Sequence, residues 1–261
     1  VIEKPMCLRR VDADEIIATA AEHDRVVTVH QSRRWDRDWL ALRHVLDGGE
    51  IGDVFNTETF VGGFEHPCRA WHSEESISGG AIYDWGSHHV DWILQLYGSS
   101  PARVLCSTHN SVWNDTTNVD QLSLWMQWDD GREATFRQSD VCAIRRPKFH
   151  VEGTKGTVEG HYEPVVTDRI VAGRGHVMDV SHHAEAPVDL AVATYDEVLG
   201  VRTTTAPPAP SPGWGFHRNL ADHLLLGEPH AVRPEQSRDV VAVLEAGQRS
   251  GANGADLIDI G

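Results

Sequence analysis

Apolar and polar positions follow two different periods within the first thirty residues. Residues 25–30, RVVTVH, form a β-branched run that predicts a short strand, and residues 15–23 predict a helix. Asp12 is placed to cap that helix, with Glu15 completing a capping box. The opening residues, VIEKPM, are typical of the end of a strand. This front segment therefore predicts one strand–helix–strand unit of a parallel sheet.

The middle of the chain changes from helical to alternating patterning. Residues 35–49 carry apolar positions at helical spacing and end at a glycine pair, and residues 53–63 predict a strand. Five alternating segments, separated by turns, fill residues 102–162. They predict an antiparallel meander with one buried face.

The last hundred residues begin without a clear period. Residues 164–213 are expected to form loops that end in a stiff proline-rich connector, TTTAPPAPSPG. Two helices, at residues 215–227 and 234–251, are expected to close the chain. The fold class is thus α/β, with a large, mainly antiparallel sheet and flanking helices.

Composition narrows the possible partners. The 261 residues carry a formal net charge of −16 that is spread along the chain, which disfavours nucleic acid and acidic membrane surfaces as partners. No run of eighteen apolar residues and no charged-then-apolar leader is visible, and we expect a cytoplasmic protein with reduced thiols. No metal site is expected either, because the candidate groups are irregularly spaced: Cys7, Cys68, Cys106, Cys142, His176, Asp179, His182, His183 and Glu185.

Candidate chemistry lies on the predicted helix over residues 81–97. Asp84, His88 and Asp91 interrupt its apolar pattern and share one stripe with Gln95. A carboxylate one turn before an imidazole can hydrogen-bond it and favour its protonated form, and an oriented histidine is a common general base. The alternative is a solvated stripe on a surface helix. Glycines before and within this helix leave room for a ligand.

A second candidate is the Glu3-Lys4-Pro5 segment at the end of the first strand. Ligands of open α/β sheets bind beyond the carboxyl ends of strands, so Lys4 could reach a substrate or cofactor. The alternative is a solvated lysine. Trp71 could line a sugar pocket with its aromatic face, although core packing is the favoured explanation for any single tryptophan.

Several segments in the same order resemble the Gfo/Idh/MocA oxidoreductases, which act mostly on sugars and polyols. The strongest are EKP at residues 3–5 and GGAIYDWGSHHVD at residues 79–91. RAWH at residues 69–72 is similar to the tryptophan-containing segment of that family. The resemblance extends over nearly the whole chain through GEIGDV, VEGTKGTVEG and the closing HLLLGEPHAVRPEQSRDVVAVLEAGQRS.

The resemblance implies hydride transfer from a secondary alcohol to NAD or NADP. Lys4 would stabilise the oxyanion, Asp84 would hold the substrate, and His88 would accept the hydroxyl proton. His72 stands where relatives often have arginine, which suggests a less acidic substrate. Arg34 would contact the cofactor edge or make a structural pair. The full implied set is cofactor contacts at Glu3, Lys4, Pro5 and Arg34 and substrate contacts at Lys4, Trp71, His72, Asp84 and His88.

One departure concerns the front of the chain, where the family's glycine-rich phosphate loop does not occur. Residues 1–34 are therefore expected to be the remnant of a Rossmann domain, with about ninety or more residues upstream. Residues 35–261 would form the substrate and oligomerisation domain, which is expected to make a homodimer or homotetramer through its open sheet. Two other functions stay open: an NAD-dependent glycoside hydrolase of the same family, and a non-catalytic binding or assembly module.

Overall fold

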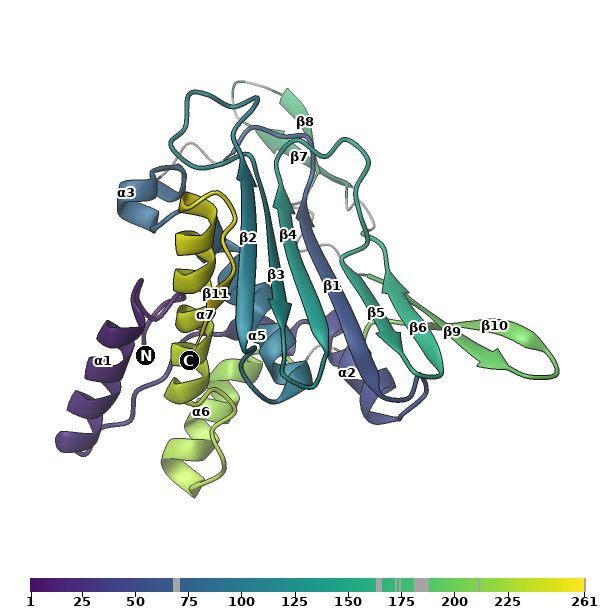
Figure 1. Cartoon of the computed structure of the whole chain (residues 1–261), viewed down its shortest axis with the longest axis horizontal. Coiled ribbons are helices and arrows are strands. Elements are labelled where there is room, and N and C mark those ends of the chain that lie inside the picture. Colours follow the sequence, from purple (N-terminus) through teal and green to yellow (C-terminus); the bar gives the residue numbers. More distant parts are fainter. Residues whose placement is uncertain are drawn as a thin grey trace.

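A computed structural model describes residues 1–260 apart from 68–70, 163–165, 172, 174, 181–187 and 211, and apart from the side chains of 73, 166–171 and 175–180. Its largest element is an open nine-stranded sheet with the order β10-β9-β6-β5-β1-β4-β3-β2-β11 (Figure 1). Neighbouring strands are antiparallel except β1 and β4, which run parallel. The strands are Val54–Gly62 (β1), Arg103–His109 (β2), Gln121–Gln127 (β3), Glu133–Ser139 (β4), Phe149–Gly153 (β5), Gly156–Gly160 (β6), Leu190–Asp196 (β9), Gly200–Ala206 (β10) and Ile258–Asp259 (β11).

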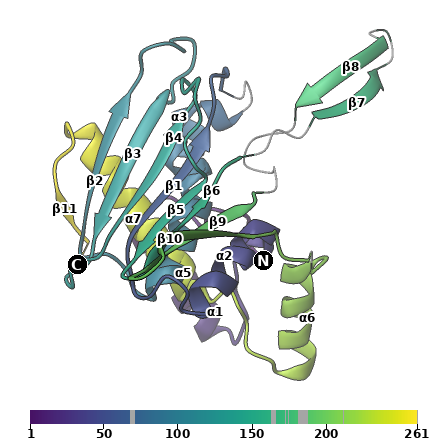
Figure 2. The same ribbon diagram turned by 90° about the vertical axis from the view of Figure 1, so that its right-hand side faces the viewer.

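Helices cover one face of this sheet, which confirms the predicted α/β class (Figure 2). The long helix α7 (Pro234–Ala252) packs against β2 and against α5 (Gly86–Tyr97), and α5 in turn contacts β4. α2 lies under the other half of the sheet, near β9. The remaining bounds are Arg10–Glu22 (α1), Ser32–Trp35 (η1), Arg37–Asp47 (α2), Trp71–Ser73 (η2), Glu75–Ser78 (α3), Ala81–Asp84 (α4) and Gly215–Leu226 (α6).

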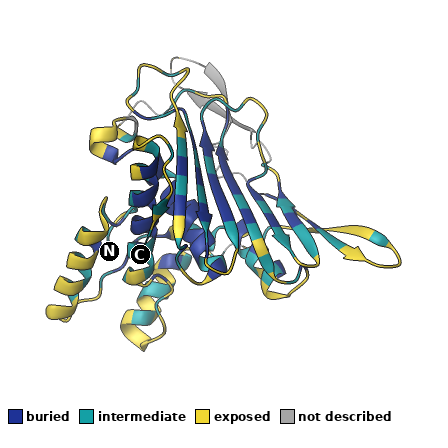
Figure 3. Cartoon of the chain, viewed as in Figure 1, coloured by how far each residue is buried: buried dark blue, intermediate teal, exposed yellow. Residues whose placement is uncertain are grey.

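Strand β3 shows why the helices cover only one face. Leu122, Leu124 and Met126 are buried against α5 and α7, while the alternate residues are half-buried on the opposite face. Figure 3 shows the same gradient, with buried residues in the middle strands and exposed residues at the sheet ends. The predicted meander with one buried face is confirmed for β2, β3 and β4 and for the β5–β6 hairpin, but its continuity was wrong, because β1 lies between β4 and β5 and runs parallel to β4. Its pairing with a second subunit stays a prediction.

The front segment forms less sheet than predicted. Ile2 and Val29 make one parallel bridge on either side of α1, and no longer strand forms at residues 25–30. Among the described residues, no further strand pairs with this bridge, so the parallel pairing is not extended into a sheet. The predicted cap was wrong, because α1 begins at Arg10 and the Asp12 carboxylate pairs with the Arg9 side chain.

The loop predicted over residues 164–213 was also wrong. β9 and β10 form a hairpin that joins the sheet beside β6, and two further strands, β7 (Val166–Val171) and β8 (Gly175–Val180), form a separate hairpin. β10 is an exposed edge strand, so it needs few apolar residues and lacks the alternating pattern. Its threonines nevertheless have high β-propensity. The proline-rich stretch after Ala206 has no helix or strand at residues 207–210.

The predicted helix over residues 81–97 is divided in two. α4 ends at Asp84, Trp85 intervenes, and α5 ends at Tyr97, followed by Gly98, whose φ of 70° is the expected left-handed helix end. The break separates Asp84 from His88 by a change of helix rather than by one continuous turn. Among the described helices, none is long and apolar enough to cross a membrane.

Candidate functional site

Lys4 and Asp84 meet in the structure although eighty residues separate them. The Lys4 ammonium donates to the Asp84 carboxylate at 2.7 Å and to the Asp84 backbone oxygen at 3.1 Å. The two side chains are 22% and 29% exposed, so a ligand can reach both. The ion pair therefore joins the two motifs that the sequence singled out.

His88 lies one turn further on, near the start of α5. Its side chain is 6% exposed, and its Nδ1 finds no hydrogen-bond partner among the described residues. Burial, and then the positive charge of Lys4, lower the pKa of His88 well below its ordinary value. The imidazole is therefore neutral at pH 7 and can accept a proton.

This geometry corrects one expectation about His88. Asp84 was expected to hydrogen-bond the imidazole and favour its protonated form. The Asp84 carboxylate binds Lys4 instead, and the pKa of His88 is lowered rather than raised. The helix break at Trp85 and the approach of Lys4 from the front segment explain the difference.

Lys4 and His88 border a hollow of about 430 Å³, whereas Asp84 is joined to it only through its ion pair with Lys4. Lys4 and His88 line it directly, together with Glu3 and residues of the segment around η1. His30 contacts the Glu3 carboxylate at 3.3 Å, and Arg33 pairs with Asp36 at 3.2 Å, so the rim carries both charges. The other lining residues are His30, Ser32, Arg33 and Asp36.

Arg34 was expected either to contact the cofactor or to make a structural pair, and in the structure it makes a structural pair with Asp91. Its guanidinium binds Asp91 with two hydrogen bonds of 2.8 and 2.6 Å, and it also binds Gln236 at 3.0 Å and the backbone oxygen of Ala231. The paired side chains of Arg34 and Asp91 are only 7% and 2% exposed. Asp91, the third member of the predicted stripe, therefore anchors α5 to η1 and α7 and does not face the hollow.

Trp71 and His72 form a stacked pair in η2, with ring centroids 3.7 Å apart. Trp71 is 55% exposed, and neither residue lines the hollow beside Lys4. The backbone oxygen of His72 accepts a hydrogen bond from the Asn118 side chain. Their expected substrate contacts, like that of Pro5 with the cofactor, stay predictions.

Asp140, just after β4, is a titratable residue that the sequence reading missed. Burial, and then the carboxylates of Asp120, Glu65 and Asp84, raise its pKa to about 7. The influence of Asp84 places this acid in the electrostatic surroundings of the site. A lone aspartate at a strand end carries no special sequence signal, and only its position at the end of β4 could have drawn attention to it.

No group of three metal-ligating residues occurs among the residues that the structure describes. The other candidate metal ligands are outside the part of the chain that the structure describes. His182, His183 and Glu185 are not described, and neither are the side chains of His176 and Asp179.

The sequence of this chain is similar to those of known proteins. Residues 39–159 match the model of the GFO/IDH/MocA C-terminal domain. The chain is 24% identical over 255 residues to scyllo-inositol 2-dehydrogenase (NADP(+)) IolW of Bacillus subtilis strain 168, which covers 96% of this chain and 69% of that protein.

Two solved structures show the fold. An NAD-binding protein from Listeria innocua superposes with a TM-score of 0.77 at 23% identity, over 98% of this chain and 70% of that one. An oxidoreductase from Agrobacterium radiobacter, in complex with NAD+, L-tartaric acid and magnesium, gives a TM-score of 0.72 at 20% identity, over 99% and 72%. The domain match confirms the family resemblance drawn from the motifs over residues 39–159, and the two structures show the fold alone.

Proposed function

We propose that this chain, which carries a GFO/IDH/MocA C-terminal domain over residues 39–159, forms the substrate-binding part of an NAD(P)-dependent oxidoreductase. The substrate would be a sugar, an inositol or a related polyol. One observation carries the proposal: a lysine ammonium and a buried neutral imidazole line one hollow, and a carboxylate pairs with that ammonium. The inositol dehydrogenase among the relatives supports this substrate class.

The described residues fit the reacting end of a nicotinamide cofactor but not its phosphates. The unpartnered Nδ1 of His88 and the accessible ammonium of Lys4 are groups that a substrate hydroxyl would complete. No glycine-rich phosphate loop occurs in the sequence. We therefore infer that these residues contact only the reacting end of the dinucleotide, with Glu3 and Pro5 beside it. When bound, a nicotinamide supplies the hydride acceptor.

The chain's own residues would control the proton and the charge on oxygen. Lys4 would donate a hydrogen bond to the substrate hydroxyl and stabilise negative charge as it develops there. Asp84 would position the Lys4 ammonium and hold a neighbouring hydroxyl. His88 would accept the hydroxyl proton while the hydride leaves the same carbon, so that the C–OH becomes C=O and two electrons leave with the hydride.

The test uses the protein with its natural N-terminus and a panel of inositols and other polyols, with NAD+ and NADP+ supplied separately. We expect absorbance of the reduced nicotinamide to appear with at least one polyol. His88→Gln should lower kcat by about 10² to 10⁴-fold, the range for a general base. His44→Gln, an exposed histidine on α2, is the matched control and should leave kcat unchanged.

Three results would contradict the proposal. Unchanged turnover in His88→Gln would remove the assigned base. Turnover of a glycoside with no net change in cofactor redox state would favour the hydrolase alternative, and failure to bind NADH would favour the non-catalytic module.

A further inference from the structure

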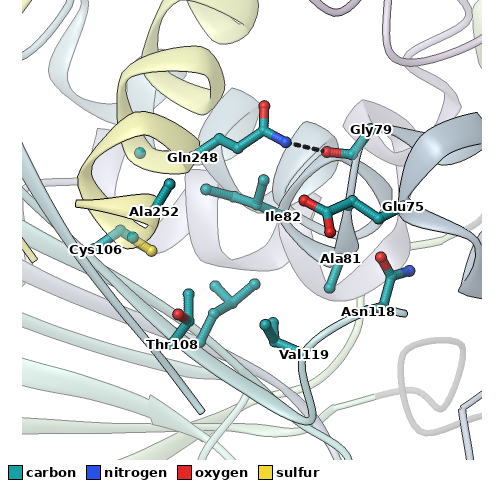
Figure 4. A pocket seen from close by; sticks show the side chains of 14 residues that line it. Glu75, Gly79, Ala81, Ile82, Cys106, Thr108, Asn118, Val119, Gln248 and Ala252 are labelled. Carbon is teal, nitrogen blue, oxygen red and sulfur yellow. Dashed lines mark hydrogen bonds between the residues drawn. The ribbon is translucent and has the colours of Figure 1, made fainter. Parts of the chain in front are cut away.

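A second cavity lies between the end of α7, strand β2 and the Gly79–Gly80 turn (Figure 4). Its volume is about 170 Å³. None of its lining residues lines the hollow beside Lys4 and His88. The cavity is therefore a separate space that the proposed reaction does not use.

Most of the cavity wall is apolar. Ile82, Val119 and Leu122 contribute aliphatic side chains, and burial raises the pKa of the Cys106 thiol to about 12, so this group is also uncharged. A Cβ on Gly80 would lie in ordinary van der Waals contact with Gln248 and Glu75, 3.7 Å from each. An apolar cavity of about 150 Å³ holds a benzene ring, so a hydrocarbon of about six carbons fits this one.

Asn118 places an unsatisfied acceptor in this apolar wall. Its side chain amide donates to the backbone oxygen of His72, which identifies the nitrogen, and its Oδ1 is buried with no hydrogen-bond partner among the described residues. The residue is only 6% exposed. Figure 4 shows the oxygen on the side of the cavity and the nitrogen turned away from it. A buried acceptor without a donor is costly, and a ligand N–H would satisfy it.

The remaining polar groups define the charge of the ligand. The Gln248 amide is already occupied, because it donates to the backbone oxygen of Gly79 at 2.7 Å. The Glu75 carboxylate lies exposed at the cavity, 3.9 Å from the position of a Cβ on Gly80. Thr108 adds a neutral hydroxyl beside the acceptor of Asn118, and Glu75 is the only charged residue among the described lining residues, so the cavity favours a cationic donor.

We propose that this cavity binds a compact ammonium compound with a hydrocarbon body of about six carbons. The body occupies the apolar wall, and the ammonium donates to Asn118 Oδ1 and lies near the Glu75 carboxylate. This assignment does not depend on the proposed oxidoreductase activity.

The test is a titration of the ¹⁵N-labelled protein at pH 7 with three probes that share one ring: cyclohexylamine, cyclohexanol and cyclohexanecarboxylate. We expect cyclohexylamine to give saturable shifts of the backbone amides of Gly79, Gly80 and Gly251. The carboxylate should bind about tenfold more weakly or not at all, because its charge faces Glu75.

Two variants locate the effect. Glu75→Gln should weaken cyclohexylamine binding up to about fivefold, since an exposed ion pair contributes little, and should leave cyclohexanol binding unchanged. Glu74→Gln, the exposed neighbour outside the cavity, is the matched control. Ala252→Leu should fill the cavity and lower the affinity for every probe by about tenfold or more.

The proposal is overturned if cyclohexylamine gives no saturable shifts in the native protein. Equal affinity for all three probes, together with an unchanged Glu75→Gln variant, would overturn the ammonium assignment. If Ala252→Leu does not fold, the Glu75 and Glu74 pair still decides the outcome.

Discussion

Asp84 and Asp91 lie one and a half to two helical turns apart and both bind a cation, yet their surroundings are opposite. The pair formed by Lys4 and Asp84 is 22% and 29% exposed and borders a hollow. The pair formed by Arg34 and Asp91 is 7% and 2% exposed and has further hydrogen bonds to Gln236 and Ala231. Charge pairing alone therefore does not identify a functional group, whereas access to a ligand does.

The largest expected effect comes from breaking the buried pair. Arg34→Met leaves the Asp91 carboxylate buried without a cation, and we expect the free energy of unfolding to fall by about 3–5 kcal/mol. Urea denaturation measures this change. Arg34→Met combined with Asp91→Leu should recover much of the loss, and a double variant as unstable as the single one would contradict the explanation.

Asp140 extends the comparison to a buried carboxylate among other carboxylates, those of Asp120, Glu65 and Asp84. Its folded pKa of about 7 lies above the ordinary value of 3.8, so the wild type loses stability as pH rises through that window. Asp140→Asn should be more stable than the wild type by roughly 2–4 kcal/mol at pH 8, and the difference should vanish below pH 4. Denaturant titrations at the two pH values test this, and a pH-independent difference would contradict it.

The pH dependence of stability due to His88 has the opposite sign to that of Asp140. Its folded pKa is lowered by burial, so the imidazole costs stability as pH falls below its unfolded value near 6.5. Between pH 7 and pH 5.5 the wild type should lose about 1 kcal/mol more than His88→Gln. Equal losses in the two proteins over that range would mean that the folded imidazole protonates as freely as an exposed one.

The smallest effect on stability is expected at Lys4. Lys4→Met removes a partly exposed ion pair, which should change the free energy of unfolding by less than about 1 kcal/mol. Polyol oxidation by the same variant should nevertheless be lost, because Lys4 would stabilise the developing oxyanion. A Lys4 variant that loses several kcal/mol of stability would make this pair structural, like that of Arg34 and Asp91.

Local patterns predicted much of this fold. The alternation of buried and half-buried residues in β3, the two closing helices and the left-handed end at Gly98 all follow from short-range spacing. The edge hairpin β9–β10 did not, because an exposed edge strand buries few apolar residues and so lacks the pattern.

The sequence by itself determined which residues are candidates: the lysine of EKP, and the aspartate and histidine of the helix motif. Tertiary structure alone decided how they pair. Lys4 approaches from eighty residues away and takes the Asp84 carboxylate that was expected to serve His88, while Arg34 takes Asp91. Burial then makes His88 neutral and raises the pKa of Asp140. Spacing along one helix constrains neighbours on that helix, but charge state depends on desolvation and on groups brought close by the whole fold.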